Sequence, residues 1–250
     1  MTRRALLLAA PPPTPEIVFT ARGASGFLNP DRRLEVIGAT GPRQLSVGQG
    51  CYGVFPNGDL LVQDLELPAD WRQKTFDDYY PRSQTRIWRV NPRTGAHEPL
   101  AHRERLSNFV SPCCLAGDRL AVTAMLDGKS MLYTMELDGR QARAITGPRE
   151  FVYGVSLSPD GQWFAFHADY RIHVCRIDGS DRREVASMKG QLCFGTQWSP
   201  DGEHVLFQVC DSKQDPAHDW SRIASVRRDG RDWRWWSAPA GAWFGATYGP

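Results

Sequence analysis

Short runs in which apolar and polar residues alternate recur along most of the chain. Residues 52–64, 86–100, 110–125 and 131–146 each contain two such runs around a Gly-containing turn. Alternation with a period of two is typical of strands that bury one face. The Asn-Gly, Thr-Gly and Asp-Gly pairs between the runs supply the positive φ values that tight hairpins need. The pattern therefore predicts an all-β chain of short antiparallel strands.

An internal repeat organises these strands. Residues 151–185 and 192–236 each begin with an aromatic-Gly pair, pass through Ser-Pro-Asp-Gly and an alternating strand, and reach a second Asp-Gly turn. Four short strands in about 40–50 residues are the pattern of a β-propeller blade. We name the strands a to d from the innermost outward, so that the first turn joins a to b and the second joins c to d. We predict a β-propeller of four-stranded antiparallel blades with five recognisable units.

The repeat varies in length almost entirely between strands b and c. The spacing from the second turn of one unit to the first turn of the next is 22 or 23 residues, whereas the spacing between the two turns of one unit ranges from 18 to 37 residues. Residues 64–86 and 210–222 are the main b–c insertions, and both contain a run with Pro, Asp and Trp. All b–c connections of a propeller lie on one face, and insertions on one face of a repeat array usually mark its binding face. We therefore expect ligand binding on this face.

The two ends of the chain suggest how the ring is completed. We divide the chain into an N-terminal extension (1–15) and a propeller domain (16–250). Residues 16–23 look like a strand b without a preceding strand a, and residues 241–250 align with a strand a. Together they would close a five-bladed ring; alternatively, the chain is a piece of a larger propeller. The apolar run near the N-terminus has six residues, fewer than the about 7–15 of a secretory signal.

Composition narrows the class of protein. The 250 residues are 41% hydrophobic, enough for a sizeable core, and the net charge of +2 is too small to indicate nucleic-acid binding. No apolar run approaches the about 20 residues of a membrane span. The six cysteines form no Cys-x-x-Cys pair, which favours buried thiols in a reducing cytoplasm, with the periplasm or secretion as the alternative.

The Ser-Pro-Asp-Gly strands at 158–161 and 199–202, followed by Asp-Gly hairpins, resemble the TolB-type (WD40-like) propeller repeat over roughly residues 50–250. The resemblance implies the fold and little about activity, because that repeat serves scaffolds, gating domains and carbohydrate-active enzymes. The polar insertions and the segment 166–171 (Phe-His-Ala-Asp-Tyr-Arg) look most like propeller lyases of uronic-acid glycans, such as oligogalacturonate lyase. Those lyases hold a divalent metal with His and Gln near the ring axis. This chain has no His directly before its Ser-Pro-Asp-Gly strands and has Gly154 and Gly195 nearby.

Four residues are candidates for β-elimination chemistry: His167, Tyr170, Arg171 and His218. A base must remove the proton on C5 of a uronate, and an acid must protonate the leaving oxygen, which suits His and Tyr. An Arg can stabilise the carboxylate as it becomes enolate-like. The alternative is that His and Tyr pack between blades while Arg forms a surface pair.

The insertion 210–222 also offers candidate metal ligands. Asp211, Asp215 and Asp219, with His218, could bind Ca²⁺ or Mn²⁺, or the Asp residues could cap the turns of their own loop. A paired-carboxylate glycoside hydrolase, with Asp77 or Asp78 against Asp211 or Asp219, is a further possibility. The cofactor therefore stays open between none and a divalent cation.

Aromatic residues in or beside the insertions are candidates for stacking on sugar rings, with packing of the insertions onto the blades as the alternative. They are Trp71, Tyr79, Tyr80, Trp220 and Trp243. Trp233, Trp235 and Trp236 belong to an outer strand and are predicted to pack between blades. Tyr153 and Phe194, each followed by Gly, are predicted to be structural, with the Gly allowing close approach near the axis.

The sequence therefore predicts a carbohydrate-active propeller. It would bind an acidic glycan or another small ligand on the face that carries the b–c insertions, and it would cleave that glycan if it is a polysaccharide lyase. The alternative is a non-catalytic TolB-like propeller that acts as a scaffold or sensor and binds a protein or peptide there.

Overall fold

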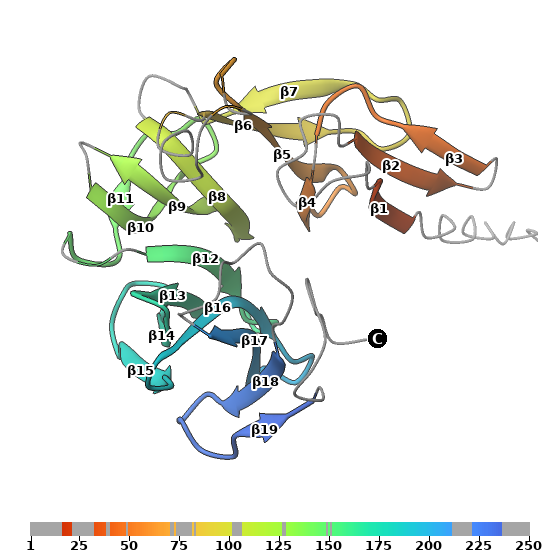
Figure 1. The fold of residues 1–250 in the computed structure, drawn as a ribbon. Coiled ribbons are helices and arrows are strands. Elements are labelled where there is room, and N and C mark those ends of the chain that lie inside the picture. The colour runs from red at the N-terminus through yellow and green to blue at the C-terminus, as the bar shows by residue number, and fades with distance from the viewer. Residues whose placement is uncertain are drawn as a thin grey trace, which may run out of the picture.

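The computed structural model describes most of the propeller domain (Figure 1). The described residues are 17–21, 33–38, 41–48, 50–70, 73, 82, 84–101, 107–126, 129–148, 150, 152–211 and 222–236. They contain 19 strands in five antiparallel sheets.

The first sheet has three strands and each of the next four sheets has four. Sheet 1 contains β1 (Ile17–Ala21), β2 (Arg33–Gly38) and β3 (Gly41–Gln44). Blade 2 contains β4 (Gly50–Val54), β5 (Leu60–Glu66), β6 (Gln84–Val90) and β7 (His97–Leu100). Blade 3 contains β8 (Ser107–Ala116), β9 (Arg119–Leu126), β10 (Lys129–Glu136) and β11 (Arg143–Ala144). Blade 4 contains β12 (Val152–Leu157), β13 (Trp163–Ala168), β14 (Arg171–Arg176) and β15 (Arg183–Ala186). Blade 5 contains β16 (Gln191–Trp198), β17 (His204–Asp211), β18 (Arg222–Arg227) and β19 (Arg234–Trp235).

The sheets follow one another around an arc as the blades of a propeller (Figure 1). In each of blades 2–5 the strands lie in chain order from a to d, and neighbours pair antiparallel. The first strands β4, β8, β12 and β16 contact one another in succession, which identifies them as the inner strands. The predicted all-β propeller of four-stranded blades is therefore confirmed. Sheet 1 begins with β1, which lies in the segment 16–23 that was predicted to be a strand b. Residues 241–250 lie outside the described part of the chain, so the closure of the ring stays a prediction.

The Ser-Pro-Asp-Gly motif forms the a–b turn, as predicted. In blade 4 the Ser158 hydroxyl accepts a hydrogen bond from the Trp163 N–H (2.9 Å), and Asp160 accepts one from the Gln162 N–H (3.0 Å). Ser199 and Asp201 accept the same two bonds in blade 5. These side chains satisfy backbone donors within their own turn, so the motif is structural.

The aromatic-Gly pair forms a bulge in the inner strand. The register of β12 against β13 shifts between Tyr153 and Ser156, and the register of β16 against β17 shifts between Phe194 and Gln197. Gly154 (φ 62°) and Gly195 (φ 67°) are left-handed at these bulges. A Cβ built on Gly195 meets nothing nearer than 3.8 Å. For Gly195, the backbone conformation therefore explains the glycine, rather than the close approach that the sequence suggested.

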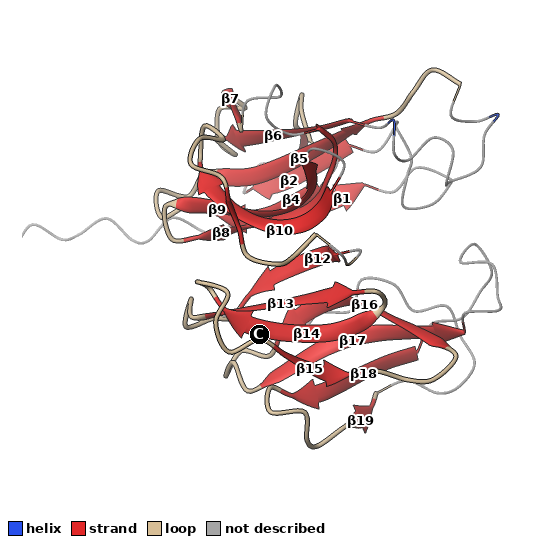
Figure 2. Ribbon diagram, turned by 90° about the vertical axis from the view of Figure 1, so that its left-hand side faces the viewer, coloured by secondary structure: helices blue, strands red, loops and turns tan. Residues whose placement is uncertain are grey.

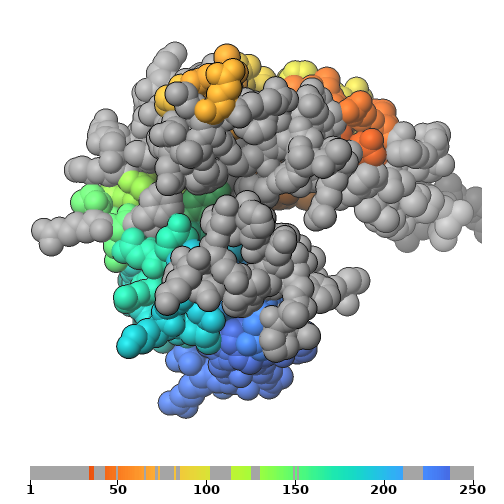
Figure 3. Space-filling view, viewed as in Figure 1, coloured from red at the N-terminus to blue at the C-terminus, as the bar shows by residue number. Residues whose placement is uncertain are grey.

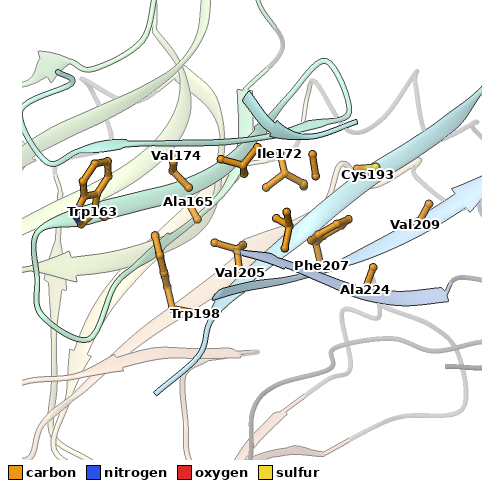
Figure 4. Packing of buried hydrophobic residues seen from close by; sticks show 13 residues of the cluster. Trp163, Ala165, Ile172, Val174, Cys193, Trp198, Val205, Phe207, Val209 and Ala224 are labelled. Carbon is orange, nitrogen blue, oxygen red and sulfur yellow. The ribbon is translucent and has the colours of Figure 1, made fainter. Parts of the chain in front are cut away.

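Blades 4 and 5 share a hydrophobic core (Figure 4). Trp163, Ala165 and Val174 of blade 4 pack with Val205 and Phe207 of blade 5. Trp233 and Trp235 pack against this core, which agrees with their predicted role. Trp236 departs from the prediction, because it is 57% exposed and donates its indole N–H to the Ser225 hydroxyl (2.8 Å). Successive residues of a strand point to opposite faces, so Trp236 faces away from the core that Trp235 joins.

Thr196 on the inner strand of blade 5 ties that blade to blade 4. Its hydroxyl lies 3.0 Å from the Ala165 carbonyl oxygen, 3.2 Å from the Gly154 carbonyl oxygen and 3.0 Å from the Ser156 hydroxyl. Thr196 itself is buried, with 5% of its surface exposed.

We expect Thr196→Val to lower the free energy of unfolding by about 1–3 kcal/mol, because the buried polar atoms around it lose a hydrogen-bond partner. Urea unfolding measures this loss. Thr196→Ser is the control, since it keeps the hydroxyl, and it should lose clearly less than Thr196→Val. Equal losses in the two variants would show that the methyl group and not the hydroxyl matters.

The propeller has two distinct faces. The a–b and c–d turns lie on one of them, which we call the turn face, and turns of successive blades approach each other there: a Cβ on Gly202 would lie 3.7 Å from Pro159. The b–c connections lie on the other, the loop face, where β5 and β17 end before the two insertions. These strand ends lie on the same side of the molecule in Figure 2, as the sequence analysis predicted.

Candidate functional site

Three of the predicted site residues lie in the described part of blade 4: His167, Tyr170 and Arg171. Asp211 ends β17, but its side chain is not among those described. The other predicted site residues lie outside the described residues, and their roles stay predictions; they are Trp71, Tyr79, Tyr80, Asp215, His218, Asp219, Trp220 and Trp243.

Tyr170 lies in a two-residue turn that joins β13 to β14 on the loop face. The turn is closed by the pair Ala168 and Arg171, and its two residues are left-handed, with φ 48° at Asp169 and 59° at Tyr170. Hairpins of this length favour Asn-Gly, because a bulky residue in the left-handed region costs about 1–2 kcal/mol. The turn is held by the next blade, since the Cys193 N–H donates to the Tyr170 carbonyl oxygen (3.0 Å). A strained residue fixed in this way is a candidate for a functional role.

His167 lies beneath Tyr170 and is surrounded by aromatic rings. Its imidazole is nearly parallel to the Tyr170 ring (12°, centroids 6.0 Å apart). The Tyr153 ring lies 5.2 Å away, and the Phe194 ring of blade 5 meets it edge-on at 6.5 Å. We call these four residues the aromatic cluster. His167 is 3% exposed, whereas Tyr170 is 43% exposed, so Tyr170 presents the cluster to solvent.

Burial determines the charge state of His167. Desolvation by burial and, to a smaller extent, the nearby His173 together lower the pKa of its imidazole from an ordinary value of 6.5 to about 3. Nδ1 of His167 is buried and has no hydrogen-bond partner among the residues that the structure describes. The imidazole is therefore neutral at physiological pH. In this position it supports the Tyr170 ring and has little surface with which to reach a substrate.

Arg171 lies on the other side of the blade from His167. His167 is the register partner of Ile172, whereas Arg171 is the partner of Ala168, and successive residues of a strand point to opposite faces. The Arg171 guanidinium pairs with Glu184 on β15 (3.3 Å), and its side chain is 60% exposed. The structure thus brings His167 and Tyr170 together and places Arg171 at the same turn but on the opposite face.

Each of blades 2–5 has a buried polar residue at the position that His167 occupies in blade 4. The register between strands b and c places Gln63 of β5, Thr123 of β9 and Gln208 of β17 at the equivalent site, and all three are buried. The sequence reasoning missed this series. A polar residue five or six positions after the glycine of each a–b turn was the available signal.

The described residues contain no group of three or more His, Cys, Asp or Glu side chains that could hold a metal ion. The predicted ligands of the insertion 210–222 fall outside that search or have no described side chain. The choice between a divalent cation and none therefore stays open.

The four blades and the aromatic cluster define the class of the protein: a β-propeller whose loop face carries a partly exposed aromatic cluster. No protein-family model matches the sequence. None of the described helical turns is long and apolar enough to cross a membrane.

Solved structures share the fold at low sequence identity. A protein assigned as TolB from Agrobacterium tumefaciens is 17% identical, with a TM-score of 0.60 over 84% of this chain and 76% of that one. TolB from Acinetobacter baumannii is 16% identical, with a TM-score of 0.56 over 82% of this chain and 49% of that one. Oligogalacturonate lyase from Vibrio parahaemolyticus is 15% identical, with a TM-score of 0.56 over 81% of this chain and 59% of that one.

These likenesses confirm the TolB-type propeller fold that the repeat indicated. The chain spans about half the length of the Acinetobacter TolB and under two thirds of the lyase. Identity at this level shows the fold and leaves the activity to the site itself.

Proposed function

We propose that the protein binds an acidic oligosaccharide on its loop face, with Tyr170 as a platform for a sugar ring. The observation that carries this proposal is the Tyr170 ring, which is backed by His167 and partly exposed at a left-handed turn. The apolar face of a sugar ring fits an aromatic ring, and a platform already held in place loses little conformational entropy on binding.

The exposed guanidinium of Arg171 is the reason to propose an acidic ligand rather than a neutral one. One nitrogen of its guanidinium pairs with Glu184, and the rest of this largely exposed group has donors available for a carboxylate. Because Tyr170 and Arg171 lie on opposite faces of one turn, a ligand must extend over the blade edge to reach both. An oligosaccharide of several units meets that requirement better than a single sugar.

Cleavage by β-elimination is the finer form of this proposal. It needs a base in contact with the substrate. His167 is buried and neutral, which favours a structural role over that of the base. Tyr170 is the described candidate acid or base that a substrate can touch, since Arg171 would serve only to hold the carboxylate. A lyase creates a 4,5-unsaturated uronate, so ultraviolet absorbance after incubation with oligouronates tests cleavage separately from binding.

The test of binding is Tyr170→Asn. Asn tolerates the left-handed conformation, so this variant removes the ring while favouring the turn. We expect it to weaken binding of an oligouronate at least about tenfold, the loss of one stacking contact of about 1.5 kcal/mol, with the melting temperature kept or raised. Isothermal titration calorimetry measures the affinity.

Ile177→Ala is the matched control. Ile177 is 38% exposed and follows β14 on the turn face of the same blade, so its truncation should leave the affinity unchanged. If no oligosaccharide in a panel of neutral, uronic and sulfated chains binds the wild-type protein, the proposal fails. A protein or peptide ligand that requires Tyr170 would then identify the propeller as a scaffold or sensor.

A further inference from the structure

Three arginines surround one buried tryptophan on the turn face, where blades 4 and 5 meet. The guanidinium carbons of Arg176, Arg228 and Arg183 lie 4.3, 4.9 and 5.2 Å from the ring centroid of Trp163. Because all three distances are to the same centroid, any two of these carbons are at most about 10 Å apart. Like charges in water still repel each other over this distance at ordinary ionic strength. We call Arg176, Arg183 and Arg228 the arginine cluster.

Both blades contribute to the arginine cluster. Arg176 is the register partner of Trp163, and Arg183 is the partner of Val174, so both point toward blade 5 with the shared core. Arg228 follows β18 of blade 5 and reaches back to Trp163. Blades 4 and 5 lie next to each other in the lower part of Figure 3.

The cluster has hydrogen-bond donors to spare. The Arg176 side chain makes no hydrogen bond or ion pair with any residue of the described chain. Its guanidinium lies over the Trp163 ring, and its charge, like that of Arg228, lowers the pKa of the nearby Asp160. Nε of Arg183 is buried and has no hydrogen-bond partner within the described ranges. Within the described part of the chain, Arg183 and Arg228 each make one ion pair, to Asp181 (3.3 Å) and Glu203 (3.4 Å) respectively. Both carboxylates are more than 40% exposed. Asp160 is held by its own turn through Ser158 and the Gln162 N–H.

Among blades 2–5, the residue at the position of Arg176 lacks a hydrogen bond or ion pair within the described chain only in blade 4. The register places one residue of each other blade at the same site, and each of these has a polar partner: Asn91 donates to Asp59 (3.3 Å), Glu136 pairs with Arg140 (3.8 Å), and Arg227 pairs with Glu203 (3.6 Å). The fold therefore does not require, at this site, an arginine that makes no hydrogen bond or ion pair within the described chain.

We propose that the arginine cluster binds a tetrahedral oxyanion, the phosphate or sulfate group of a small ligand or of a substituted glycan. Such a group has several oxygens that accept hydrogen bonds from guanidinium groups arriving from different directions, whereas a carboxylate is satisfied by one bidentate arginine. The indole of Trp163 holds the guanidinium planes by cation–π contacts, so the donors are arranged before the anion arrives.

The experiment compares Arg176→Gln with Arg140→Gln in the full chain. Arg140→Gln removes the same charge from the turn face of blade 3, where Arg140 pairs with Glu136. Binding of inorganic phosphate, of sulfate and of a sulfated oligosaccharide is measured by calorimetry at millimolar concentration and constant ionic strength. Low concentration matters because both anions stabilise most proteins by exclusion from the surface.

We expect saturable binding of at least one of these anions to the wild-type protein. Arg176→Gln should weaken it at least about tenfold, the loss of a charge-assisted hydrogen bond, and Arg140→Gln by less than about twofold. Arg228→Gln is the second variant and should behave as Arg176→Gln does. Binding of the sulfated oligosaccharide alone would identify a glycan as the source of the anion.

The proposal is overturned if no anion binds saturably. It is also overturned if Arg176→Gln and Arg228→Gln weaken binding no more than the control Arg140→Gln does. Either result leaves the oligosaccharide site on the loop face untouched. Because Tyr170→Asn acts on that other face, loss of anion binding in Tyr170→Asn would also contradict a separate site here.

Discussion

Lowering the pH from 7.5 to 4.5 is expected to remove about 2.5 kcal/mol of the free energy of unfolding through His167 alone. In the folded protein, burial holds the pKa of His167 at about 3, whereas the ordinary value is 6.5. Below pH 6.5 the unfolded chain binds a proton at this side chain and the folded protein does not. The stability that the neutral imidazole contributes is therefore complete above pH 6.5 and is lost progressively as the pH falls toward 3.

The variant that isolates this effect is His167→Gln. Gln63 and Gln208 occupy the equivalent position in blades 2 and 5, so the fold already accommodates this side chain there. Urea unfolding at pH 7.5 and 4.5 should show a loss on acidification that is smaller by about 2.5 kcal/mol in His167→Gln than in the wild-type protein.

Other groups that titrate in this range are common to both proteins and cancel in the comparison. His173 also has a pKa lowered by burial and by Arg182, and Glu184 has a pKa lowered by Ser187 and Arg171. An equal loss on acidification in the two proteins would mean that His167 is accessible to protons in the folded state. It would then regain its candidacy as a general base.

Gly48→Ala is expected to destabilise the protein by about 3 kcal/mol, for two separate reasons. A Cβ at residue 48 would lie 2.0 Å from Cγ1 of Val62, which is fully buried on β5, so the junction of sheet 1 and blade 2 must shift. The backbone of Gly48 is also left-handed (φ 100°), which an L-residue adopts at a cost. The main chain has little freedom to relax, because the Gly48 N–H donates to Asp64 and its carbonyl oxygen accepts from the Leu34 N–H.

Two further variants separate the two reasons. Gly58 is left-handed as well (φ 87°), but a Cβ there meets nothing within 4 Å, so Gly58→Ala measures the backbone cost alone, about 1 kcal/mol. Val62→Ala removes the clashing methyl group, so the double variant with Gly48→Ala should be at least about 1 kcal/mol more stable than the sum of the single effects. Equal losses at Gly48 and Gly58, or strict additivity, would contradict the close approach.

The candidate site was predictable from the sequence only in part. The segment 166–171 was recognised, and His167 and Tyr170 do lie together, because a two-residue turn keeps neighbours in sequence close in space. Tyr153 and Phe194 were assigned to packing alone, yet they enclose His167. Arg171 was grouped with His167, but the alternation of side chains along β14 carries it to the opposite face.

The sequence by itself determined the strands, the turns and the blades, because alternation, Asn-Gly or Asp-Gly pairs and the Ser-Pro-Asp-Gly motif act over a few residues and recur at regular spacing. The tertiary structure decided the properties that depend on neighbours from another strand or blade. The lowered pKa of His167 results from burial under Tyr170. Trp236 is exposed because of the face on which it lies in its blade, and the arginine cluster forms because two blades meet. Register shifts at the bulges and contacts between blades set those neighbours. The contact between Ser156 and Thr196, for example, joins residues 40 positions apart, beyond the reach of any local pattern.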